Sequence, residues 1–368
     1  MIMKYTVITC SVVACQFLVS LPAAAQNTLT VPMEIVRVSN PNLSAESPGS
    51  VTLYRIKPQY TLQTIDGSSR TELSLGGTIE RSSNSYLSPD HNLPSLGVLW
   101  EKTGEVSVFK LRASLEEAST RDTEFADLGR VVQDGTQRTG TLGTAWIYNL
   151  AAGTFVELTA SHARVSYDTP SLVGYGETRG SGVYGFESSP VSRYRLTTGI
   201  SRLNPNGSGE SASLGEIGLG YEVDIRQGTT LKATVGAVHT NAPIGMTKPV
   251  GALSLDYKGE RVSYTVAWSR EISADGLRGR YARSEGFDAS LTYPFTAYTS
   301  LALGIRHARS LEADRDVGVT AFARFRSELT RFWAFTLGLE QRRSMPLGGP
   351  TARGNSVAVG FVYSNPDF

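Results

Sequence analysis

The segment 331–343, RFWAFTLGLEQRR, carries the pattern that decides the fold. Large apolar residues stand at every second position, and small or polar residues stand between them. Because successive side chains of a β-strand point to opposite faces, such a run has one apolar face and one polar face. The run 316–326 repeats this alternation just upstream, across a tight turn at 327–330. A sheet of such strands must cover its apolar face, either with a second sheet or with lipid.

Alternating runs of this kind recur from residue 29 to residue 363, and no segment after residue 25 has a convincing helical period. Short turns, such as 66–69 and 226–228, alternate along the chain with long loops, of which 119–137 is the longest. We count about eighteen strands, or roughly sixteen without the first run and the irregular run near Gly180. Pro58 is expected to weaken its strand or to mark a bulge, because it has no amide hydrogen to donate. The layout predicts an all-β, transmembrane, antiparallel up-and-down β-barrel with both termini at the short-turn end.

The first 25 residues are predicted to be a cleaved signal peptide, which leaves a single barrel domain over 26–368. Lys4 precedes a mostly apolar run at 5–21, and three alanines at 23–25 form a cleavage site before Gln26. A transmembrane anchor is disfavoured because the run is short and ends in small residues. A lipoprotein signal at Cys15 is disfavoured because the apolar run continues past it. Since Cys10 and Cys15 both lie in this segment, the processed chain would have no disulfide, no thiol chemistry and no cysteine-ligated metal.

The charge balance excludes some classes of partner. The chain has 35 Lys and Arg against 34 Asp and Glu, so no basic excess points to nucleic acid. A hydrophobic fraction of 40% and a mean hydropathy of −0.14 argue against a helical membrane protein. They do not argue against a barrel, because barrel strands are apolar on one face only.

The face opposite the apolar stripes carries too many charges for the core of a β-sandwich, whereas a water-filled lumen accommodates them. A secreted propeller or sandwich would place these charges on its outside. The candidate lumen-lining residues are Arg55, Lys57, Lys110, Arg112, Arg193, Arg195, Glu216, Lys232, Arg306, Arg324 and Glu340. Their arginines could select anions in a pore. Acidic residues are nearly as numerous, so pairs between neighbouring strands are the alternative.

Aromatic residues near the ends of the apolar stripes favour lipid as the covering medium, since amphipathic rings settle at membrane interfaces. Those residues are Tyr54, Trp100, Tyr194, Tyr257, Trp268, Trp333 and Tyr363. The terminal Phe368 resembles the aromatic signal that the barrel-assembly machinery reads in outer-membrane barrels. It is set off from the last alternating run by 365–367, which departs from the usual register.

The sequence shows no motif that indicates catalysis, a cofactor or a metal. The four histidines are far apart and have no ligand-spaced partners. Asp122, Glu124, Asp127 and Asp134 in the longest loop could bind a divalent cation, but we expect a solvated acidic loop. We therefore predict that the protein is not an enzyme.

Over 54–165 the chain resembles the β-barrel porin type 2 family. The resemblance lies in RIKPQY at 55–60, in ERSSN at 80–84 opening a loop that closes on Pro94 and Trp100, and in the loop 119–136. It implies an outer-membrane barrel of the kind often associated with exopolysaccharide production and export, and it brings no catalytic residues with it.

These observations lead to two hypotheses about function. The first is a pore or conduit in the Gram-negative outer membrane, supporting exopolysaccharide export or solute passage. The second is a structural or receptor barrel with a plugged lumen, which binds a surface partner through its long loops. Outer-membrane lipid and the barrel-assembly machinery are the expected partners in both, with polysaccharide or small solutes added in the first.

Overall fold

The computed structural model describes residues 25–128, 134–207, 209–241, 245–276, 279–312, 316–366 and 368. The predicted signal peptide lies outside the described residues except for Ala25, with which the first strand begins. Within the described residues, no helix is long and apolar enough to cross a membrane.

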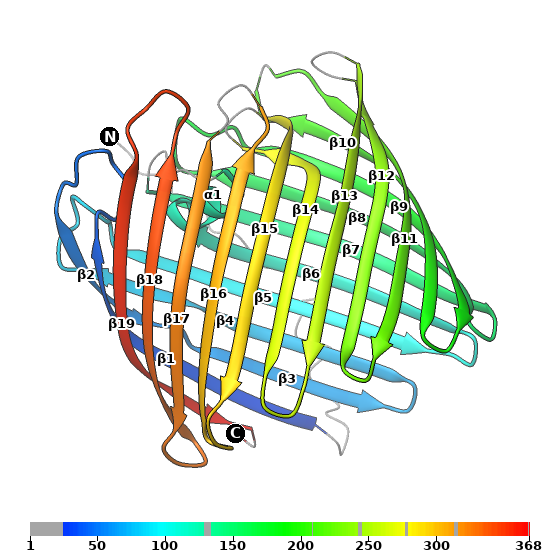
Figure 1. The fold of residues 1–368 in the computed structure, drawn as a ribbon, viewed down its shortest axis with the longest axis horizontal. Helices are drawn as coiled ribbons and strands as arrows, with labels where there is room; N and C mark the ends of the chain where they lie inside the picture. Colours follow the sequence, from blue (N-terminus) through cyan, green and yellow to red (C-terminus); the bar gives the residue numbers. More distant parts are fainter. Residues whose placement is uncertain are drawn as a thin grey trace, which may run out of the picture.

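The described chain forms one antiparallel sheet that closes on itself (Figure 1). The first half contains β1 (Ala25–Ser39), β2 (Ser50–Ile56), β3 (Gln59–Asp66), β4 (Ser69–Ser82), β5 (His91–Thr103), β6 (Ser107–Ser119), α1 (Thr120–Leu128), β7 (Thr136–Ala151), β8 (Thr154–Tyr167) and β9 (Tyr175–Ser189). The second half contains β10 (Ser192–Pro205), β11 (Ala212–Arg226), β12 (Thr229–Thr240), β13 (Met246–Lys258), β14 (Ser263–Asp275), β15 (Arg280–Pro294), β16 (Thr299–Ser310), β17 (Val317–Glu328), β18 (Trp333–Met345) and β19 (Ala352–Asn365). Apart from β2 and β3, consecutive strands pair with each other, and β1 closes the ring by pairing with β19.

The barrel has 18 strand positions because β2 and β3 share one of them. Both pair with β1 on one side and with β4 on the other. The break falls at Lys57 and Pro58, where proline cannot donate to the ladder. The predictions of about eighteen strands and of an interruption at Pro58 are confirmed, and the two runs that we regarded as least regular both form strands, β1 and β9.

Short turns and long loops lie at opposite ends of the barrel, as predicted. Leu29 near the start of β1 pairs with Asn365 at the end of β19, so the described chain begins and ends at the short-turn end. Aromatic rings gather near that end in neighbouring pairs, such as Tyr257 with Tyr264 and Trp333 with Tyr363. Such a band of aromatic rings is typical of a membrane interface.

The outward face is apolar and exposed along the whole ring. Ile35, Ile200 and Leu219 are between 54% and 72% exposed although each lies within a regular strand. Large exposed apolar surfaces mark contact with another molecule or with lipid. A belt that runs around a closed barrel fits an acyl-chain environment better than a local protein contact.

Candidate functional site

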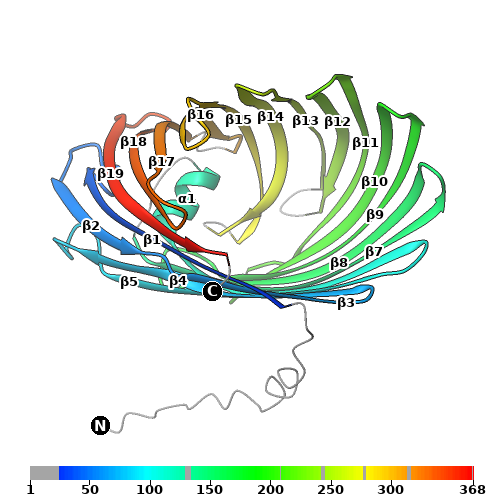
Figure 2. The ribbon, with the colours of Figure 1, turned by 90° about the horizontal axis from the view of Figure 1, so that it is seen from below.

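The helix α1 lies inside the ring of strands (Figure 2). It belongs to the connection between β6 and β7, the longest loop in the sequence. Two hydrogen bonds close the base of this connection: the Thr120 amide donates to the Gly135 carbonyl at 2.9 Å, and the Gly135 amide donates to the Thr120 hydroxyl at 2.8 Å. The expectation that no helix follows residue 25 was therefore wrong.

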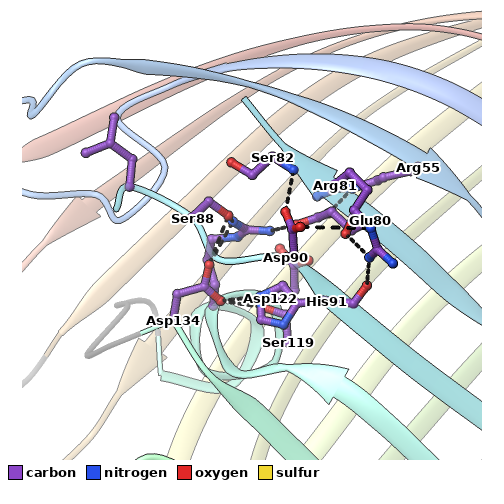
Figure 3. A network of polar contacts seen from close by, with 12 residues as sticks. Arg55, Glu80, Arg81, Ser82, Ser88, Asp90, His91, Ser119, Asp122 and Asp134 are labelled. Atoms are coloured by element: carbon purple, nitrogen blue, oxygen red, sulfur yellow. Dashed lines mark hydrogen bonds and ion pairs between the residues drawn. The ribbon is translucent and has the colours of Figure 1, made fainter. Parts of the chain in front are cut away.

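A buried charged cluster joins α1 to the wall formed by β4 and β5 (Figure 3). Arg121 donates to Asp134 at 3.0 Å, to Ser88 at 2.6 Å and to Glu80 on β4 at 3.4 Å. The other oxygen of Asp134 lies 3.2 Å from the His91 ring on β5. The side chains of Arg121, Glu80, Asp134 and His91 are all 5% exposed or less. Hydrogen bonds of this kind are strong because both members carry charge and little water competes for them.

The environment of Asp134 keeps that carboxyl ionised. Burial alone raises the pKa of Asp134, but its hydrogen bond with His91 and the positive charge of Arg121 lower the pKa below its ordinary value. Asp134 belongs to the acidic loop that we expected to be solvated, and for this residue the expectation was wrong. The side chains of Glu124 and Asp127 lie outside the described part of the structure. Among the described residues, no group of three or more His, Cys, Asp or Glu side chains could hold a metal ion.

A second contact ties α1 to β18, on the far side of β1 from β4. Arg342 on β18 donates to Asp122 at 2.8 Å and to Glu340 at 2.7 Å, and its guanidinium lies 5.4 Å from the centre of the Phe125 ring. Partial burial raises the pKa of Asp122, but the charges of Arg342 and Arg121 outweigh it and lower the pKa to about 2. The helix is therefore attached to β4 and to β18, which are separated in the ring only by β19, β1 and the position shared by β2 and β3, so both attachments lie on the same side of the lumen.

Two cavities lie beside α1. The larger has a volume of about 680 Å³ and extends between α1 and the wall formed by β1, β2, β17, β18 and β19. The smaller, of about 220 Å³, lies between α1 and β16 to β18. Asp122, Arg324, Glu340 and Arg342 line both, so these four side chains stand at the junction of the two spaces.

The structure brings five of the predicted lumen-lining residues to these cavities. Arg55, Lys57, Arg324 and Glu340 line the larger cavity, and Arg306 lines the smaller together with Arg324 and Glu340. Each of the four cations has an acidic neighbour: Arg55 contacts Glu80, Lys57 lies 2.8 Å from Glu34, Arg306 2.9 Å from Asp288 and Arg324 3.9 Å from Glu340.

The other six predicted residues lie on the inward face of other strands and away from α1. Most of them form pairs across neighbouring strands: Lys110 with Glu101 at 3.0 Å, Arg193 and Arg195 with Glu222 at 3.0 Å and 3.4 Å, and Lys232 with Asp256 at 3.9 Å. Glu216 on β11 pairs with Arg179 on β9, across β10. Arg112 has no ion-pair partner within the part of the chain that the structure describes. Whether these eleven side chains meet a passing solute stays a prediction.

Sequence reasoning missed the residues that fix α1 in place. Glu80, Arg121 and Arg342 were not among the candidates, because each lies in an ordinary alternating or loop segment. Their partners come from distant parts of the chain, and Asp122 and Arg342 are separated by 220 positions. No local pattern could have indicated these contacts.

The long-loop end of the barrel is narrowed on the side away from β18. Tyr281 at the start of β15 reaches Ser201 on β10 at 2.5 Å and donates to Glu177 on β9 at 3.0 Å. A buried apolar cluster surrounds this bridge and includes Leu203 and Leu214. The mouth is therefore partly closed from one side, and the helix α1 occupies the other side.

The fold is that of known porins. The chain resembles a BenF-like porin from Pseudomonas fluorescens Pf-5, with a TM-score of 0.56 and 12% identity over 94% of this chain and 100% of that one. It also resembles the outer membrane protein OpdK from Pseudomonas aeruginosa, with a TM-score of 0.54 and 11% identity over the same shares. A structure of OpdK with vanillate matches with a TM-score of 0.53 and 9% identity, again over 94% and 100%. No family model and no curated protein sequence matches the chain, so the resemblance to the β-barrel porin type 2 family stays a prediction.

Proposed function

We propose that this protein is an outer-membrane channel for small anionic solutes, constricted by α1. The observation that carries the proposal is the lining of the larger cavity, which presents six basic and three acidic side chains to the space beside α1. The basic residues are Arg55, Lys57, Arg121, Arg324, Arg326 and Arg342, and the acidic residues are Glu34, Asp122 and Glu340.

Arg326 is the basic residue of this lining whose charge is not neutralised by an ion pair among the described residues. The other five cations each have an acidic neighbour, whereas Arg326 has no ion-pair partner within the described part of the chain. It is exposed within the cavity wall on β17. A unit charge acting over about 5 Å of water-like medium contributes about 1 kcal/mol, which corresponds to roughly a fivefold preference for anions.

The similar structures support the same class of solute. Vanillate, which OpdK binds in one of them, is a small aromatic carboxylate. OpdK is described as an outer membrane protein, which supports the predicted location, as does the exposed apolar belt of this chain. Exopolysaccharide export receives no support from these similarities and rests on the sequence resemblance alone.

The test is ion selectivity in planar lipid bilayers. We expect the purified protein to give discrete open steps, with a reversal potential in a salt gradient that indicates anion preference. Replacing Arg326 by Gln should remove most of that preference. The matched control is Arg202→Gln, which removes an exposed arginine on β10 between the buried residues Ser201 and Leu203. Cation preference, or equal effects of the two substitutions, would contradict the proposal.

One observation favours the second function, a plugged barrel that binds a partner through its loops. The helix α1 lies inside the ring of strands, and the apolar cluster around Tyr281 narrows the lumen near the long-loop end. If the correctly folded protein carries no current in a planar bilayer, the plugged barrel is favoured over the channel.

A further inference from the structure

A regular ladder of side chains runs along the outward face of β18 and β19. It joins residues that are directly opposite one another in the register of the two strands. From the short-turn end to the long-loop end the pairs are Trp333 with Tyr363, Phe335 with Phe361, Leu337 with Val359, Leu339 with Val357, Gln341 with Asn355, and Arg343 with Arg353. The ladder thus passes from aromatic to aliphatic, then to amide, and ends in two positive charges.

The last pair is unusual because it places two arginines opposite each other. Like charges directly opposite in an antiparallel pair repel each other and destabilise it. Neither Arg343 nor Arg353 has an ion-pair partner among the described residues, and the Nε of Arg343 is buried without a hydrogen-bond partner. Two other outward arginines of the long-loop half each have an acidic neighbour: Arg138 lies 2.7 Å from Glu117, and Arg270 lies 3.0 Å from Glu285.

We propose that Arg343 and Arg353 bind the phosphate of a phosphorylated lipid in the membrane leaflet at the long-loop end. Two guanidinium groups side by side offer several charge-assisted hydrogen bonds to one phosphate, and the bound anion removes their mutual repulsion. The amides of Gln341 and Asn355, which are joined by a hydrogen bond of 3.0 Å, lie at the level of the polar backbone of the lipid.

The aliphatic part of the ladder fits the acyl chains of the same lipid. Leu339 and Val357 are 49% and 46% exposed on the outward face, and their pair is the second along the ladder from the arginine pair. Along a strand, the six steps from Leu337 to Arg343 span about 20 Å. That length is roughly half the thickness of a bilayer with its headgroups, so one leaflet reaches from the arginines to the middle of the membrane.

The arginine pair and the aliphatic residues form one continuous surface, and this continuity distinguishes a lipid from free phosphate. A free anion would use the arginines alone and would gain nothing from the apolar residues below them. A lipid phosphate uses both, because its headgroup and its chains are held at a fixed distance from each other. The proposal requires a barrel embedded in a membrane and does not depend on which solute passes through the lumen.

The experiment is native mass spectrometry of the full chain in detergent, titrated with lipid A, which is a phosphorylated glycolipid. The variant is Arg343→Gln with Arg353→Gln, and the control is Arg138→Gln, an outward arginine that is already paired with Glu117. We expect the double variant to bind lipid A about tenfold more weakly or worse, and the control to bind it as the unaltered chain does. Lipid A without its phosphates should bind the unaltered chain no better than it binds the double variant.

The unfolding temperature, measured with and without lipid A, is a second test. If the two arginines had only a structural role, lipid A would not change the order of the two proteins. Without lipid, the double variant should unfold at a higher temperature than the unaltered chain, because the repulsion is gone. With lipid A the order should reverse, because the unaltered chain gains the bound phosphate.

Three outcomes would overturn the proposal: equal lipid A binding by the variant and the unaltered chain, equal binding of the dephosphorylated lipid, or displacement of lipid A by millimolar inorganic phosphate. The last would indicate a free-phosphate site. None of them bears on the channel proposal, which ion selectivity tests separately.

Discussion

Replacing Arg121 by Gln should release α1 from the wall of the barrel. Arg121 joins the helix to Glu80 on β4 and to Asp134 at the base of the same loop. Glutamine is shorter than arginine and uncharged, so it can replace neither contact. The contact of Asp122 with Arg342 on β18 remains, and it becomes the main link between α1 and the wall.

The free-energy cost of Arg121→Gln follows from the burial of the ion pairs that it removes. Removing one partner of a buried ion pair generally costs about 3–5 kcal/mol, because the other charge remains without compensation. Here Asp134 keeps its contacts with His91, Ser88 and Ser119, and Glu80 keeps Arg55, so the lower end of this range applies. A loss of about 3 kcal/mol raises the population of detached helix roughly 150-fold.

Single-channel recording measures this directly. We expect Arg121→Gln to give larger open conductance and more current noise than the unaltered chain, since a detached helix no longer holds the constriction at one width. The control is Arg193→Gln, which removes the same charge from the opposite wall, where Arg193 pairs with Glu187 and Glu222 without touching α1. If Arg121→Gln folds, as judged by heat-modifiable migration on a gel, and its currents match those of the control, the constriction role assigned to α1 is wrong.

Three further predictions concern other parts of the barrel. Asp122→Asn should raise the population of detached helix about fivefold, and current noise should rise with it. The effect is small because the Asp122 side chain is 46% exposed, so its pair with Arg342 contributes only about 1 kcal/mol. Since docking lowers the pKa of Asp122 to about 2, this contribution should be complete above about pH 4 and should disappear as the pH falls through about 2, which recordings across that range would show. Gly360→Ala should lower the temperature at which the gel migration changes, because a Cβ at Gly360 would meet the Met33 carbonyl oxygen at 2.4 Å, at a cost of about 1–3 kcal/mol; an unchanged transition would contradict the close approach of β1 and β19. Tyr281→Phe should cost about 1 kcal/mol by the same measurement through the loss of its hydrogen bonds, and no change would show that the bridge contributes nothing.

The strands could be predicted because their signal is local. A period of two over ten or more residues identifies a strand without knowledge of its partner, and a closed ring of such strands has little freedom in its arrangement. Pro58 could be interpreted in the same way, since its missing amide hydrogen acts within its own strand. The inward or outward position of Arg193 and Arg195 also follows from alternation with the exposed Tyr194 and Leu196.

The helix α1 could not be predicted because its stability is not local. Thr120–Leu128 is nine residues long, which is too short to be stable in isolation. Its place depends on Arg121 meeting Glu80 and on Asp122 meeting Arg342, and these partners lie 41 and 220 positions away. Asp134 looked like part of a solvated acidic loop for a similar reason, because the partners that bury it, Arg121 and His91, lie 13 and 43 positions away.

The distribution of charge around the larger cavity would allow a nearly neutral chain to favour anions, as we propose. Each other cation of this lining lies against an acidic side chain, either in the wall, as Lys57 does with Glu34, or in the connection that carries α1, as Arg342 does with Asp122, so the two charges largely cancel at the centre of the lumen. A passing anion could bind such a cation only by displacing its acidic partner, which costs free energy. Arg326 on β17 needs no displacement, because no acidic partner lies against it among the described residues. We therefore assign the sign of selectivity in this cavity to Arg326, its one arginine without an ion-pair partner among the described residues, rather than to the number of arginines, and we assign to the paired cations the shape of the lumen and the position of α1.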